Sequence, residues 1–145
     1  MATLTSNKVS AGTQPAGIRV GLVAKSAVFS MGAGTPNGIT SLSSGDVIQM
    51  IKVPQNSNVV DLYVATLITG QGSYVVGDGV STARYIAAQA VSVGATAIVR
   101  LNATSYVPYT YSTDDTIDFV YSASTNASGS GAMYMVAIIS LDSAL

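Results

Sequence analysis

The sequence predicts an all-β protein, best described as a jelly-roll-like β-sandwich of about eight strands. In many short segments apolar and polar residues alternate with a period of two, which is the pattern of half-buried strands. Turns rich in glycine and proline separate these segments, and no segment has the periodicity and caps of a long helix. At 145 residues the chain has the length of one domain.

Two strands are predicted early in the chain. In residues 18–25, apolar residues alternate with Arg19 and Lys25 on the opposite face. Residues 46–53 form the second candidate, which ends at Pro54 because proline has no N–H to donate to a sheet. Between them, the uncharged and Gly-, Ser- and Thr-rich residues 26–45 indicate a long loop or an irregular arm.

The next predicted strand covers residues 59–68 and follows a turn. Its apolar face consists of Val60, Leu62, Val64 and Ile68, with Asp61 and Tyr63 on the other face. Gly77-Asp78-Gly79 indicates a tight turn after a short strand at residues 73–76. Residues 84–90 fit either a strand or a short helix, because alanine favours helix. Residues 96–102 are predicted as a strand.

The last two strands close the predicted domain. Residues 116–124 alternate, which places Asp118 on the solvent face. Residues 132–141 are apolar on both faces, which indicates a central or covered strand. The predicted organisation is an extended N-terminal arm at residues 1–16 and a single β-sandwich domain at residues 17–145.

Charge is scarce in this chain. Only 9% of residues are charged, with a net charge of −1, against about 25% charged residues in ordinary domains. The cations are scattered and form no basic stripe, so we expect no nucleic acid partner. No apolar stretch is free of polar interruption and the N-terminus lacks a secretory pattern, so we expect a soluble protein without membrane contact. Such a surface predicts that other subunits cover much of it.

The residue inventory excludes most catalytic sites. The chain has no His, Cys, Glu or Trp, which removes Ser-His-Asp and Cys-His arrangements and ordinary zinc sites. We therefore expect no enzymatic activity, no cofactor and no metal. The acidic cluster Asp114, Asp115 and Asp118 could offer oxygen ligands to Ca²⁺. A turn followed by a strand fits it better, because EF-hand spacing and its glycine are missing.

Three tyrosines form the candidate interface. Tyr106, Tyr109 and Tyr111 alternate around Pro108, in a chain with eight Tyr. Tyrosine offers a large contact area with a polar tip, as subunit interfaces and sugar-stacking faces require. Three interpretations stay open: a contact between subunits, plain packing of an edge strand, and, as the weakest of them, ligand binding.

A set of short motifs follows in a fixed order along the chain. They are residues 44–54 (SGDVIQMIKVP), 59–64 (VVDLYV), 76–78 (VGD) and 84–87 (RYIA). In this order and spacing, the chain resembles the jelly-roll capsid cement, or head decoration, proteins of tailed bacteriophages. The resemblance extends over residues 44–141, while the N-terminal third departs from the pattern.

The resemblance implies a non-enzymatic virion structural protein, made in the host cytoplasm, that binds the capsid exterior. It would stabilise the shell by bridging major capsid subunits. Its implied partners are the phage major capsid protein and further copies of itself, as a dimer or trimer. Two other functions remain open on the residues alone: a phage tail or fibre subunit, and a carbohydrate-binding β-sandwich that uses the tyrosine-rich edge.

Overall fold

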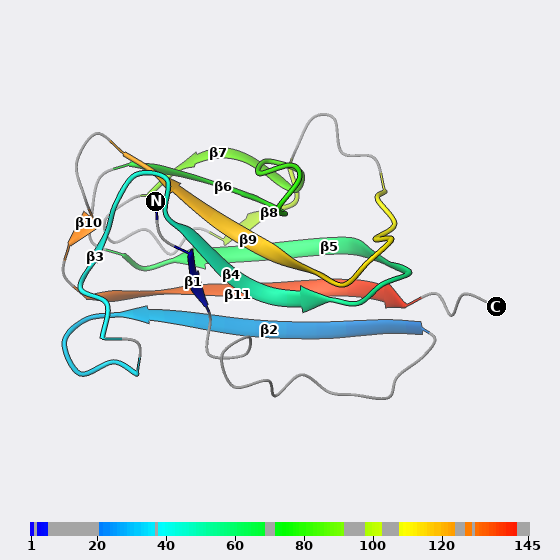
Figure 1. Ribbon diagram of the computed structural model, residues 1–145, viewed down its shortest axis with the longest axis horizontal. Helices are drawn as coiled ribbons and strands as arrows, with labels where there is room; N and C mark the ends of the chain where they lie inside the picture. Colours follow the sequence, from blue (N-terminus) through cyan, green and yellow to red (C-terminus); the bar gives the residue numbers. More distant parts are fainter. Residues whose placement is uncertain are drawn as a thin grey trace.

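The computed structural model is a jelly-roll-like sandwich of two β-sheets, as the sequence predicts (Figure 1). It describes residues 1, 3–5, 21–36, 38–68, 72–91, 98–102, 108–123, 127–128 and 130–141. Within these ranges every regular element is a strand, and short strands of two or three residues raise the number above the expected eight. No helix in the described ranges is long and apolar enough to cross a membrane.

The first sheet has five strands. In spatial order they are β1 (Thr3–Thr5), β4 (Val47–Val53), β9 (Asp115–Ser122), β6 (Ser73–Gly77) and β7 (Ile86–Ala90). β1 runs parallel to β4, and the other neighbours are antiparallel. Residues 84–90 were expected to form either a strand or a short helix, and β7 shows that residues 86–90 form a strand. Of the predicted N-terminal arm the structure describes Met1 and β1, and its division from the domain stays a prediction.

The second sheet has four strands. In spatial order they are β2 (Gly21–Met31), β11 (Gly131–Leu141), β5 (Ser57–Thr66) and β8 (Ile98–Arg100). β11 is central, which confirms the prediction from its two apolar faces, and it pairs with β2 along its whole length. β10 (Ala127–Ser128) and β3 (Ser41–Leu42) form a separate two-stranded ladder.

The core lies between the two sheets and contains the inward residues of both. Phe29, Leu42 and Phe119 have no exposed surface, and the rings of Tyr74 and Phe119 stack with centroids 4.6 Å apart. Burying one such side chain stabilises the fold by about 1.5–3 kcal/mol. The core therefore accounts for the buried side of the long strands. The apolar side predicted for residues 18–25 is wrong, because Leu22 and Ala24 face outward while Val23 is buried.

A β-bulge changes the predicted face of β5. The register between β5 and β11 shifts between Ile138 and Ile139, which pair with Asp61 and Val59 and leave Val60 as the extra residue. Val60 is consequently 51% exposed, while Val59 and Leu62 are buried. The prediction that Val60 shares the inward face with Leu62 is wrong, because an extra residue inverts the alternation beyond it.

The predicted loop at residues 26–45 is also partly wrong. β2 continues through Met31, and Ala27, Phe29 and Met31 are buried in the core. Among the described residues, 32–36, 38–40 and 43–45 fit the expected irregular connection, on either side of the short strand β3. In residues 26–31 the lack of charge reflects a strand between an apolar core and a weakly polar outer face, not a loop.

Candidate functional site

The structure describes two of the three tyrosines of the candidate interface, Tyr109 and Tyr111. Tyr106 lies outside the described residues. Tyr111 is 2% exposed, and Tyr109 packs edge-on against it with ring centroids 5.0 Å apart. The Arg84 guanidinium lies 3.8 Å from the centroid of the Tyr109 ring. These two rings therefore have little free surface on which a sugar could stack, and their role between subunits stays a prediction.

Tyr111 leads into a buried polar cluster centred on Asp78, which is 1% exposed. The Tyr111 hydroxyl donates to Asp78 Oδ2 at 3.2 Å and shares a hydrogen bond with the Tyr85 hydroxyl. Arg84 Nε forms an ion pair with the same carboxylate oxygen. Burial, with the neighbouring Tyr85 and Asp78, raises the pKa of Tyr111 far above its ordinary value. The cluster joins the segment around Tyr111 to the turn after β6.

The other carboxylate oxygen of Asp78 shapes that turn. Asp78 Oδ1 accepts hydrogen bonds from the N–H groups of Val80 and Ser81, at 3.1 and 2.7 Å. The Asp78 N–H donates to the Ser81 carbonyl at 3.0 Å, which confirms the predicted turn. Both oxygens are thus occupied, and no buried side-chain polar atom in the described ranges lacks a partner. These contacts hold the turn after β6 against the segment around Tyr111.

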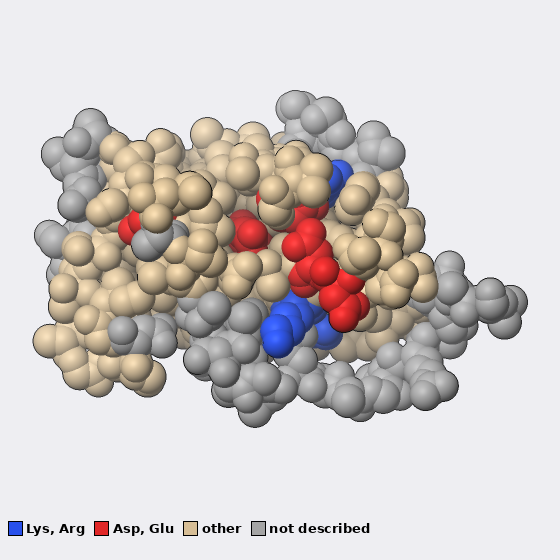
Figure 2. Space-filling model, viewed as in Figure 1, with Lys and Arg blue, Asp and Glu red and all other residues tan. Residues whose placement is uncertain are grey.

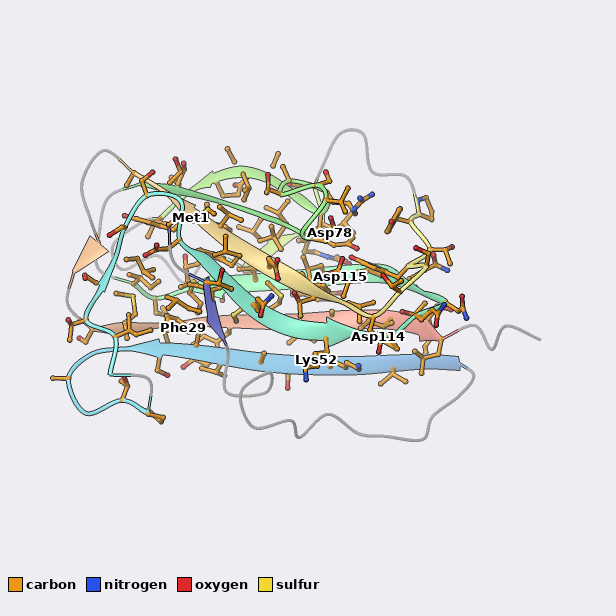
Figure 3. The ribbon with its side chains drawn as sticks, in the orientation of Figure 1. Met1, Phe29, Lys52, Asp78, Asp114 and Asp115 are labelled. Carbon is orange, nitrogen blue, oxygen red and sulfur yellow. The ribbon has the colours of Figure 1, made fainter. Side chains whose placement is uncertain are left out.

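The acidic residues gather on the side of the five-stranded sheet. Figure 2 shows acidic side chains as a band with basic side chains beside it, and Figure 3 shows Asp78, Asp115, Asp114 and Lys52 one after another along it. The band borders an open groove of about 440 Å³. The groove is lined by Lys25, Gln49, Lys52, Val53, Pro54, Asp114, Asp115 and Thr116.

The carboxylates beside this groove accept hydrogen bonds from backbone N–H groups of other residues in the chain. Asp114 Oδ1 accepts from the Gln55 N–H, and Asp115 Oδ1 accepts from the Thr116 N–H, both at 2.8 Å. Across the groove, Lys25 Nζ donates to the Lys52 carbonyl at 2.8 Å, and burial lowers the pKa of Lys25. In the described part of the chain no three carboxylates are arranged to hold a metal ion together.

Asp118 is buried, so its predicted place on the solvent face is wrong. It is 5% exposed because it lies opposite Gly77 in the sheet, beside the turn that follows β6. Thr116 Oγ1 donates to Asp118 Oδ1 at 2.7 Å. Burial raises the pKa of Asp118 to about 6, and the negative charges of Asp115 and Asp78 act in the same direction.

The outward face of the four-stranded sheet is different in character, and we call it the β11 face. It consists of the outward residues Leu22, Ala24, Ser26, Val28 and Ser30 of β2, Ala132, Tyr134, Val136, Ile138 and Ser140 of β11, Asn58, Asp61, Tyr63 and Ala65 of β5, and Ile98 and Arg100 of β8. Leu22 and Ile98 are 68% and 67% exposed, and Tyr134 and Val136 are 43% and 37% exposed.

One ion pair interrupts this apolar face. Arg100 Nη2 lies 2.7 Å from Asp61 Oδ2 and donates to the Tyr63 hydroxyl at 3.1 Å. The Arg100 guanidinium also lies 4.9 Å from the centroid of the Tyr63 ring. The two charges balance, so the β11 face is apolar and neutral. Its signal in the sequence was the final strand, which is apolar on both sides although only one side meets the core.

Comparisons with known proteins place the fold. No protein-family model and no curated protein matches the chain. A chain in the capsid of Ralstonia phage GP4 is similar at a TM-score of 0.68 and 17% identity, over 98% of this chain and 99% of that one. A chain of the cyanophage Pam1 capsid asymmetric unit is similar at 0.66 and 16%, over 90% and 91%.

A third similar chain comes from the acidic stable capsid structure of Helicobacter pylori bacteriophage KHP30. It has a TM-score of 0.50 and 12% identity, and the match covers 84% of this chain and 94% of that chain. Identities at this level carry information about the fold alone. The chain therefore shares the β-sandwich fold of chains found in phage capsids.

Proposed function

We propose that this chain is a non-enzymatic structural protein of a bacteriophage virion that binds the outside of the capsid and cements the shell. The supporting observation is its likeness to chains of the GP4 and Pam1 capsids, which covers at least 90% of both chains in each comparison. Because coverage is nearly equal in both directions, the likeness is to a whole chain of similar size. It is not a likeness to one domain of a much larger protein.

The composition and surface support the same proposal. A chain with 9% charged residues and a broad apolar sheet face suits an assembly in which neighbours cover that surface. The polar clusters around Asp78 and Asp118 are occupied by internal hydrogen bonds and ion pairs. Such clusters fix the fold of a small, stable module and offer no reacting group.

The physical basis of cementing is mass action. A protein that binds only the assembled shell stabilises it by RT ln(1 + [L]/Kd) at each site, which is about 2.7 kcal/mol at a free concentration of one hundred times Kd. A bridge between two shell subunits adds its free energy to theirs. Repeated over many sites, a modest affinity becomes a large resistance to internal pressure.

The decisive experiment locates the chain in purified phage particles. Quantitative mass spectrometry should find it in many copies, and gold-labelled antibody should bind intact heads without disruption of the shell. Particles that lack the chain should release DNA at a lower temperature, and adding the purified chain back should restore the original temperature.

Four outcomes would contradict this proposal. Particles without any copies would remove the virion role, and label confined to the tail would support a tail or fibre subunit instead. Heads that carry the chain but release DNA at the same temperature without it would leave a head protein that does not cement. Specific retention on a glycan array, with no binding to heads, would favour the carbohydrate-binding alternative.

A further inference from the structure

The β11 face has the size of a specific protein contact. β2 and β11 pair over 11 residues each, which at ~3.3 Å per residue makes the face ~36 Å long. Three strands and the short β8 at ~4.8 Å spacing make it ~14–19 Å wide. Its footprint is therefore roughly 500–700 Å², so two such faces would bury roughly 1,000–1,400 Å² in total, near the lower end of stable interfaces.

The centre of this face has the composition of an interface core. Tyr134 and Val136 lie on the central strand, and their cross-strand neighbours on β5 are Ala65 and Tyr63. An aromatic residue among aliphatic ones, with charges kept toward one side, is the arrangement that interface cores favour. The serines of β2 keep its outward side small, which allows a flat surface to approach closely.

Charge limits the kind of partner that fits. The β11 face carries one cation and one anion, Arg100 and Asp61, and they already pair with each other. A nucleic acid would require an excess of positive charge, and a strongly charged protein surface would find no complement here. A second copy of the same neutral face meets no repulsion, and a two-fold axis makes it self-complementary.

We infer that two copies of this chain associate face to face through their β11 faces, with Tyr134 and Val136 near the centre of the contact. The closed pair hides the exposed apolar side chains Leu22, Ile98, Tyr134 and Val136 and leaves the acidic groove side outward. This inference goes beyond the proposed capsid role and does not depend on it, because it concerns the free protein in solution.

The first test measures the mass of the full chain by light scattering and sedimentation at micromolar concentrations. The wild type should be a dimer. Val136→Lys places a charge at the centre of the contact and should weaken association at least 10-fold. The matched control is Val120→Lys, on the central strand β9 and the outer side of the other sheet, between Val47 and Val75. This control should remain dimeric, and circular dichroism should show that both variants are folded.

A second measurement holds even if Val136→Lys does not fold. The chain has no cysteine, so Val136→Cys introduces a single thiol. Its alkylation by a maleimide should slow as protein concentration rises through the Kd, while the rate for Val120→Cys should not change. A wild type that stays monomeric at tens of micromolar, or an alkylation rate at position 136 independent of concentration, would overturn the inference. The particle experiments above are unaffected by either result.

Discussion

The outer sides of the two sheets differ in the number of charged residues that they carry. Around the five-stranded sheet lie Lys52, Asp78, Arg84, Asp114, Asp115 and Asp118, whereas the β11 face has only Asp61 and Arg100. In a chain where 9% of residues are charged, this distribution leaves the β11 face with one ion pair whose charges cancel. On the acidic side Asp78 and Asp118 are buried, but Lys52 and Asp114 are exposed to solvent. The difference indicates that the acidic side is better suited to solvent and the β11 face is better suited to contact.

The two ion pairs of these sides differ in the same way. The Asp78 side chain is 1% exposed and that of Arg84 is 18% exposed, whereas those of Asp61 and Arg100 are 22% and 65% exposed. Water screens the second pair and leaves the first almost unscreened. An Arg–Asp ion pair therefore stabilises the fold on one side of the molecule, whereas on the other side it only balances the charge of the surface.

The largest effect should come from Asp78→Ala. This change leaves the Arg84 guanidinium, the Tyr111 hydroxyl and two turn N–H groups without their acceptor. We expect a loss of about 3–5 kcal/mol in the free energy of unfolding, measured by urea denaturation. The matched change Asp61→Ala should lose no more than about 1 kcal/mol. Equal losses in the free energy of unfolding would show that the two ion pairs contribute equally to stability.

Gly77→Ala tests how tightly the turn after β6 packs against Gly77 at the end of that strand. A Cβ on Gly77 would overlap the Ser81 carbonyl oxygen and the backbone of Thr82. We expect a loss of about 2–3 kcal/mol, seen as a lower melting temperature. Gly79→Ala is the control two residues away, because its Cβ would lie 4.0 Å from Asp115 Oδ1. A melting temperature for Gly77→Ala as high as that of this control would show that the turn is loose.

Asp118→Asn should stabilise the protein at neutral pH. Asp118 has a pKa of about 6 in the folded protein and ionises near 3.8 in the unfolded chain. Its ionisation therefore opposes folding, so the free energy of unfolding falls as pH rises from about 4 to 6 and stays lower above that. Asparagine removes this penalty and can still accept the Thr116 hydrogen bond. We expect a gain of about 1–2 kcal/mol at pH 7.5.

The pH dependence of this gain is its own control. Well below pH 3.8 the wild-type carboxyl is protonated in both states, so urea titrations of wild type and Asp118→Asn should then coincide. A gain of equal size at low and neutral pH would assign the effect to packing. A loss at pH 7.5 would show that the Asp118 carboxylate itself stabilises the fold.

The smallest effect should be that of calcium. Asp114 and Asp115 each direct an oxygen to a backbone N–H, and Asp118 is buried beside Thr116. Millimolar CaCl₂ should therefore leave the melting temperature within about 1 °C of its value in EDTA, since even 1 kcal/mol would move it by about 2–8 °C. A melting temperature that rises with calcium and falls again with EDTA would show that the acidic side binds a cation.

The sequence was sufficient for the fold class because burial on one side imposes a period of two on each strand. It was insufficient for Val60, because a bulge depends on how β5 pairs with β11, and two adjacent valines look alike in a local pattern. Asp118 was misplaced for a similar reason: the turn that covers it belongs to another strand. The Asp78–Tyr111 contact joins residues 33 positions apart, and no local rule relates them.

The full-length pairing of β11 with β2 also governs how the protein is made. β2 is translated early, yet its partner in the middle of the sheet is the last strand described. A nascent chain on the ribosome therefore carries β2 and β5 with the gap between them unfilled, and exposes apolar strands that pair readily with other chains. Folding of this sheet must wait until Gly131–Leu141 leaves the exit tunnel, because this strand fills the place between the other two.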